Sequence, residues 1–147
     1  MNDMRDLYQQ LILDHNKSPR NKGPLENSTS RAVGHNPLCG DRIEVALRLD
    51  GDMIADIKFE GSGCAISQAS ASMMTTVLKG FSTGRAQELF EKFHAMLTGD
   101  GGDMEQLGKL AALADVYKFP ARVKCAMLPW RTLEASLDSQ PAMISTE

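Results

Sequence analysis

The chain has 147 residues, 42% of them hydrophobic and 24% charged, and this balance predicts one globular domain with its own core. A formal charge of -3 and a pI near 5.6 exclude the basic footprint of a nucleic-acid-binding domain, and no apolar run approaches the roughly 20 residues of a membrane span. Three cysteines without an apolar N-terminal signal predict a cytoplasmic, reducing setting. We assign residues 1–138 to a single domain and residues 139–147 to a flexible C-terminal tail.

The first predicted element is a helix over residues 4–15, where apolar side chains recur at helical spacing. Residues 16–30 are rich in Asn, Lys, Ser, Pro and Gly without an apolar period, which predicts a long surface loop that wraps around the domain. A short strand is expected over residues 29–34, leading into the first cysteine.

Residues 43–49 and 53–59 alternate between apolar and polar side chains, the pattern of a β-hairpin with one buried face. Both apolar sets share that face only if the connecting loop has an odd number of residues, and Asp50-Gly51-Asp52 meets this condition. The hairpin would then bring the segments carrying Cys39 and Cys64 to one end of the sheet. The apolar positions are Ile43, Val45, Leu47 and Leu49 in the first strand, and Met53, Ala55, Ile57 and Phe59 in the second.

Helices are predicted over residues 65–79, closed by Gly80, over residues 83–97 and over residues 107–114. A last helix begins at Pro120, and Cys125 falls about 200° from its buried stripe, which argues against a role as core filler. Pro129 removes a backbone hydrogen bond within this helix, so a kink or irregularity is expected there.

The three cysteines and one carboxylate form a candidate metal site made of Cys39, Asp41, Cys64 and Cys125. Three sulfurs and one oxygen are the four ligands that a tetrahedral zinc site takes. Cys64 begins a helix, where the exposed N–H groups favour thiolate over thiol. Free cysteines are also common core residues and no CxxC pair is present, so spacing alone leaves both readings open.

The sequence around each cysteine resembles, in order, one of the three cysteine motifs of the U-type iron-sulfur cluster assembly proteins. This family includes IscU, SufU and the N-terminal part of NifU, and the resemblance covers nearly the whole chain. It implies an α+β fold, in which helices cover a small antiparallel β-sheet and the metal site lies at one exposed end. The motifs are Asn36-Pro37-Leu38-Cys39-Gly40-Asp41, Gly61-Ser62-Gly63-Cys64-Ala65-Ile66-Ser67 and Phe119-Pro120-Ala121-Arg122-Val123-Lys124-Cys125.

Within that family the chain is similar to the SufU branch, since Lys124 stands where IscU-type proteins have a histidine and the segment around residues 81–103 is longer. The resemblance implies a zinc-dependent sulfurtransferase that accepts persulfide sulfur from a pyridoxal-phosphate cysteine desulfurase similar to SufS. It also implies delivery of that sulfur to downstream iron-sulfur scaffold proteins. By motif, the zinc ligands would be Cys39, Asp41, Cys64 and Cys125, with Cys39 as the catalytic sulfur acceptor.

Two other functions stay open. Thiolates also bind iron-sulfur clusters, so the chain could be a scaffold for a nascent cluster, although a protonated Lys124 is no ligand. It could also be a structural zinc-binding interaction module, although such sites normally use only Cys and His. His35 is the nearby imidazole that could replace Asp41, with a plain surface histidine as the alternative, whereas His15 and His94 are expected to have no metal role.

Overall fold

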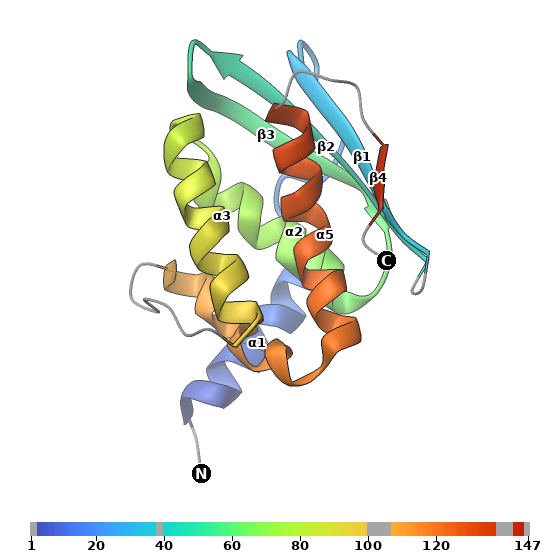
Figure 1. Cartoon of the computed structure of the whole chain (residues 1–147), viewed down its shortest axis with the longest axis vertical. Coiled ribbons are helices and arrows are strands. Elements are labelled where there is room, and N and C mark those ends of the chain that lie inside the picture. Colours follow the sequence, from blue (N-terminus) through green and yellow to red (C-terminus); the bar gives the residue numbers. More distant parts are fainter. Residues whose placement is uncertain (1–2, 38–39, 100–106, 138–142, 146–147) are drawn as a thin grey trace.

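The computed structural model describes residues 3–37, 40–99, 107–137 and 143–145, and Figure 1 shows helices gathered on one face of a sheet. Among the helices described, none combines the length and apolar character that crossing a membrane requires. The elements are α1 (Asp3–Lys17), β1 (Ser30–Asn36), β2 (Asp41–Asp50), β3 (Met53–Ser62), α2 (Ala65–Leu78), α3 (Thr83–Leu97), the 3-10 helix η1 (Gly108–Lys118), α5 (Pro120–Leu137) and β4 (Met143–Ser145).

The sheet has the strand order β3-β2-β1-β4. The first three strands are antiparallel, as predicted, and β4 adds a short parallel strand to β1. Helix α5 packs against β1 and β2, and α2 packs against β3 (Figure 1). Strand β4 lies inside the predicted tail of residues 139–147, and the sequence pattern did not indicate its pairing; the flexibility of that tail stays a prediction.

The register of β2 and β3 pairs odd-numbered residues with odd-numbered residues, such as Val45 with Phe59 and Leu47 with Ile57, as the alternation predicts. The connection itself differs from the prediction, because the turn contains two residues, Gly51-Asp52, and not three. Gly51 has a φ of 63°, which glycine adopts without strain. A two-residue loop alone would place the two apolar sets on opposite faces, so the register has to change elsewhere.

A β-bulge near the turn makes that change. Ile54 pairs with Leu49 and the register then shifts by one residue, which leaves Ala55 as the extra residue of β3. Beyond the bulge the side chains are inverted relative to the prediction: Ile54 is fully buried, whereas Met53 is 43% exposed. The assignment of Met53 to the buried face was therefore wrong, and Ile54 takes its place in the core.

The helices lie close to their predicted ranges. Ser82 caps α3, since its Oγ accepts a hydrogen bond from the Arg85 N–H at 3.2 Å. The helix predicted over residues 107–114 is the longer 3-10 helix η1, and residues 100–106 of the loop before it lie outside the described residues. Helix α5 continues through the buried Pro129, so the helix is not interrupted at that residue.

The predicted wrapping loop follows the edge of β3. The backbone of Phe59 bonds to Asn21 and Gly23, at 3.0 and 2.9 Å. The same segment is tied to α2, because the Asn21 side-chain amide donates to Thr75 Oγ1 at 3.0 Å. The loop therefore holds both the sheet edge and the helix that begins after Cys64.

His15 of α1 contacts Ser72 of α2, next to the loop that holds the edge of β3. The imidazole is 2% exposed, and its Nδ1 lies 2.7 Å from Ser72 Oγ, which also accepts the Arg20 backbone N–H at 2.8 Å. The Ser72 hydroxyl can donate to Nδ1 only when Nδ1 carries no proton, which requires the neutral imidazole in its Nε2–H form. Burial, together with the charges of Arg20 and Lys109, lowers the pKa of His15 to about 4.

This lowered pKa predicts an acid-sensitive contribution to stability. Between pH 6.5 and about 4 the unfolded chain binds a proton at His15 and the folded chain does not, so the free energy of unfolding falls as pH falls. The loss reaches about 3 kcal/mol by pH 4. In His15→Gln, whose amide oxygen can accept from Ser72, this part of the pH dependence should vanish in urea unfolding of chelator-treated protein. An unchanged pH profile in the variant would contradict the assignment.

Candidate metal centre

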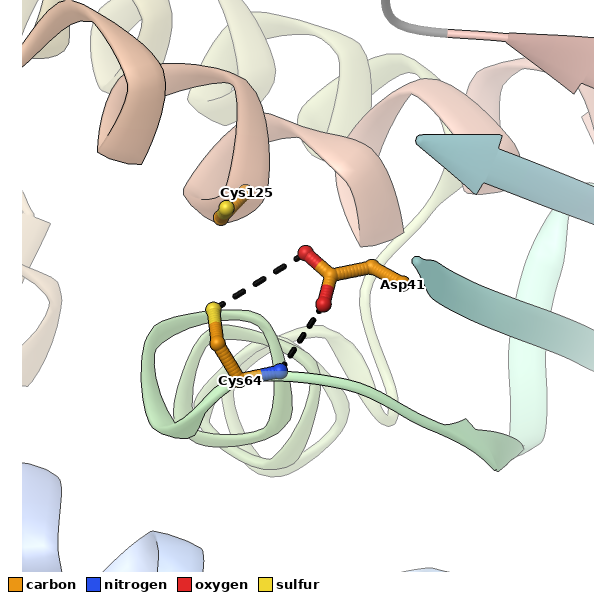
Figure 2. Close-up of side chains that lie close together, drawn as sticks. All are labelled: Asp41, Cys64 and Cys125. Carbon is orange, nitrogen blue, oxygen red and sulfur yellow. Dashed lines mark hydrogen bonds between the residues drawn. The ribbon is translucent and has the colours of Figure 1, made fainter. Parts of the chain in front are cut away.

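Asp41 is the first residue of β2, and its carboxylate is completely buried. Oδ1 accepts a hydrogen bond from the backbone N–H of Cys64 at 2.8 Å, and Oδ2 lies 3.8 Å from Cys64 Sγ (Figure 2). A buried carboxylate is stable only when hydrogen bonds or a cation compensate its charge. Asp41 thus holds the start of α2 against the end of the sheet while one oxygen faces a sulfur.

Cys64 occupies the N-cap position of α2 and is partly exposed. Its φ and ψ of -72° and 167° are extended, and its side chain makes no capping hydrogen bond. The sulfur instead points toward Asp41 (Figure 2). As predicted, the hairpin brings residue 41 and the segment leading to Cys64 to one end, since Arg42 pairs with Ser62.

Gly63 lets these two groups approach. A Cβ on Gly63 would overlap Asp41 Oδ1 and would lie 2.7 Å from Ser67 Oγ. The glycine is therefore required by a side-chain carboxylate that occupies the space of a methyl group. No larger residue fits at this position without moving Asp41.

Cys125 reaches the same place from α5. Its side chain is fully buried, but its sulfur contacts polar groups: it donates to the Ala121 carbonyl at 3.4 Å and accepts from Asn36 Nδ2 at 3.9 Å. Figure 2 shows Cys125 above the Asp41–Cys64 pair. The position of Cys125, about 200° from the buried stripe of α5, indicated a less buried side chain than the structure shows. The sulfur nevertheless faces the candidate site.

The three side chains together form a group that could hold a metal ion. One ligand atom from each of Asp41, Cys64 and Cys125 lies within 4.8 Å of the others. Zinc bonds of about 2.0–2.3 Å in a tetrahedral arrangement separate ligand atoms by roughly 3.3–3.8 Å. Small side-chain movements would therefore bring all three donors onto one ion, and the two thiols and one carboxylate suit zinc.

Comparison with known proteins agrees with this geometry. Residues 7–126 match the family model described as the NifU-like N terminal domain. The chain belongs to this family. It is 50% identical over 129 residues to the zinc-dependent sulfurtransferase SufU of Bacillus subtilis, covering 87% of each chain. It is also 38% identical over 138 residues to the iron-sulfur cluster assembly scaffold protein IscU of Streptococcus pyogenes, covering 93% of this chain and 86% of the other.

The fold is shared with solved members of the NifU-like family. The crystal structure of FiSufU, described as an iron-sulfur cluster assembly scaffold protein for the SUF system of Fervidobacterium islandicum AW-1, superposes with a TM-score of 0.85 at 39% identity, covering 90% of this chain and 98% of the other. The N-terminal NifU-like protein of Brucella abortus has a TM-score of 0.78 at 22% identity, which supports the fold alone. The predicted α+β class and the predicted family are both confirmed.

Cys39, the fourth predicted ligand of this NifU-like domain, lies outside the described residues, and its role stays a prediction. The described residues on either side of it belong to the site. Asn36 and Asp41 are paired across β1 and β2, and the Gly40 N–H donates to the Asn36 carbonyl at 2.9 Å. Residues 37–40 therefore connect two strand ends that both border the three-residue group.

The other residues considered near the site lie differently. His35 is exposed on β1 beside the buried Asn36, so strand alternation directs the imidazole to the opposite face from Cys125. That position gives no support to His35 as a replacement for Asp41. Lys124 is partly buried next to Cys125 on α5, and His94 stacks on Phe90 in α3.

Asn36 is the site neighbour that sequence reasoning missed. In the sequence it is visible only as part of a motif, yet its side chain is fully buried and its amide contacts Cys125. Its contact joins residues 89 positions apart, which no local pattern indicates. The one available signal was a polar residue directly before Pro37 in the strand that leads to Cys39.

Proposed function

We propose that this NifU-like domain is a zinc-dependent sulfurtransferase that accepts persulfide sulfur from a cysteine desulfurase for iron-sulfur cluster assembly. The observation that carries the proposal is the convergence of Asp41, Cys64 and Cys125 from three separate elements. The 50% identity to a protein named as a zinc-dependent sulfurtransferase supports the same activity. The donor is expected to be a SufS-like pyridoxal-phosphate enzyme, and the recipients downstream iron-sulfur scaffold proteins in the cytoplasm.

In this proposal Cys39, Asp41, Cys64 and Cys125 are the four zinc ligands. Bound zinc would hold the thiolates deprotonated and draw the three segments together. Asp41 is a harder and weaker donor to zinc than a thiolate. A ligand in this set is therefore displaced more easily than in a purely structural site. The N–H of Cys64 keeps the Asp41 carboxylate in place at 2.8 Å.

Cys39 is proposed as the sulfur acceptor. Its thiolate attacks the outer sulfur of the desulfurase persulfide, forming a new S–S bond at Cys39. The S–S bond on the desulfurase breaks, and the electron pair leaves with the desulfurase cysteine as a thiolate, so no oxidant or reductant is needed. Because zinc would engage the lone pair of a bound thiolate, Cys39 would attack only when it is not a ligand.

The other two cysteines are less suited to the acceptor role. Cys125 is fully buried, and Cys64 is held at the start of α2 beside Asp41. Cys39 instead lies between Pro37 and Gly40, which are both exposed. A thiol in a connection between strands can leave the ligand set without unwinding a helix.

A scaffold that binds a nascent iron-sulfur cluster and transfers it to apo-proteins is the second candidate. The 38% identity to a protein named as the IscU scaffold favours it, and thiolates serve clusters as well as zinc. Lys124 argues against it because an ammonium group is not a ligand. A structural zinc-binding interaction module is the third candidate, which the carboxylate ligand disfavours.

Metal content separates these functions. We expect protein purified without added metal to be colourless and to contain about one zinc per chain, because four ligands saturate a tetrahedral ion. Elemental analysis combined with a visible spectrum measures both properties. A brown sample with iron and sulfide in similar amounts would contradict the sulfurtransferase and support the scaffold.

A further inference from the structure

Asn36 contacts both Cys125 and Gly40 at the candidate metal centre. Its side-chain amide donates to Cys125 Sγ at 3.9 Å, and its main-chain carbonyl accepts a hydrogen bond from the Gly40 N–H at 2.9 Å. Asn36 and Cys125 are both fully buried. One residue of β1 therefore bridges a sulfur on α5 and the connection that carries Cys39.

We propose that Asn36 is a positioning residue, whose amide N–H fixes the Cys125 sulfur for metal binding and moderates its electron donation to the metal. This inference rests on the proposed function, since it concerns Cys125 as a zinc ligand. Groups that hydrogen-bond a metal ligand set its orientation and basicity and commonly change metal affinity 10–100-fold.

The contacts of Cys125 change in opposite ways when the thiol becomes a thiolate. The thiol donates to the Ala121 carbonyl at 3.4 Å, a contact that loses its hydrogen on metal binding and then sets a negative sulfur against a partly negative oxygen. The Asn36 amide is a donor, and its hydrogen bond strengthens as the sulfur gains charge. Of these two contacts, only the one to Asn36 stabilises the Cys125 thiolate, which is the form that binds a metal.

This arrangement gives Cys125 and Cys39 different roles. The Cys125 sulfur is held by α5 and by the side-chain amide of Asn36 in strand β1, so it would remain a ligand when zinc is bound. A hydrogen-bonded thiolate is also a weaker nucleophile, because part of its charge is drawn toward the donor. This hydrogen bond therefore adds to the burial of Cys125 as a reason against Cys125 as the sulfur acceptor.

The contact can be observed in the unmodified protein. With cadmium-113 as the bound metal, nuclear magnetic resonance should show a scalar coupling between the Asn36 side-chain amide protons and the metal, transmitted through the N–H···S bond. A cadmium signal typical of sulfur ligation without this coupling would overturn the role of Asn36 alone. The absence of any sulfur-bound cadmium would overturn the proposed metal site and this inference with it.

A variant tests the size of the effect. Asn36→Ala should bind zinc 10–100-fold more weakly in competition with a chelator. Thr132→Val on α5 is the matched control. Thr132 is fully buried, like Asn36, but its hydroxyl donates to the Leu128 carbonyl of its own helix. The control should retain zinc affinity within about 2-fold, because position 132 lies about two turns of α5 beyond Cys125. Equal affinities in Asn36→Ala and the unmodified protein would overturn the inference.

Discussion

Asp41→Asn should fold but bind zinc at least about 100-fold more weakly than the unmodified protein. The amide keeps the shape of the side chain and can still accept the Cys64 N–H at Oδ1, yet it loses the charge that favours a divalent ion. Competition with a chelator measures the affinity, and circular dichroism checks the fold. A variant that binds zinc as tightly as the unmodified protein would exclude Asp41 as a ligand.

Asp41→Ala provides the companion measurement. It removes the carboxylate and leaves the Cys64 N–H without its acceptor, so metal-free protein should lose about 1–3 kcal/mol of unfolding free energy in addition to the zinc affinity. The difference in metal-free stability between the Asn and Ala variants isolates the structural hydrogen bond. Similar stabilities for both variants would show that this bond does not hold α2 to the sheet.

Gly63→Ala should destabilise the fold by about 2–3 kcal/mol and weaken metal binding, because its new methyl group would displace Asp41. Gly84→Ala is the matched control: nothing lies within 4 Å of its added Cβ, and the residue stands in the first turn of α3. The control should be neutral or up to about 1 kcal/mol more stable, since alanine favours helix. Urea unfolding of both variants measures the contrast, and equal effects would contradict the close approach at Gly63.

The strand pattern predicted the end of the sheet where the site lies, because alternation fixes which residues of a hairpin share a face. It could not predict how the chain pairs odd-numbered residues of β2 with odd-numbered residues of β3. Asp50-Gly51-Asp52 would be a loop with an odd number of residues, but the chain uses a two-residue turn. A bulge at Ala55 then restores the pairing of odd-numbered residues. That choice depends on backbone twist at the turn, which the apolar pattern does not encode, so Met53 and Ile54 were exchanged.

The contacts around Cys125 show a second limit of the sequence. Helical periodicity placed this cysteine off the apolar stripe of α5, but its side chain is fully buried, and its sulfur contacts polar groups. Its partners include a backbone carbonyl one turn earlier and Asn36 on a distant strand. The second contact depends on how α5 crosses β1, and tertiary packing of that kind leaves no periodic signal in either segment.

The most direct test of sulfur transfer is peptide mass mapping after the zinc-loaded protein has been incubated with a SufS-like cysteine desulfurase and cysteine. We expect one added sulfur on the peptide that carries Cys39, and loss of sulfur acceptance in a folded Cys39→Ala variant. Added sulfur on Cys64 or Cys125, with Cys39→Ala still active, would contradict the assignment of Cys39 as the sulfur acceptor.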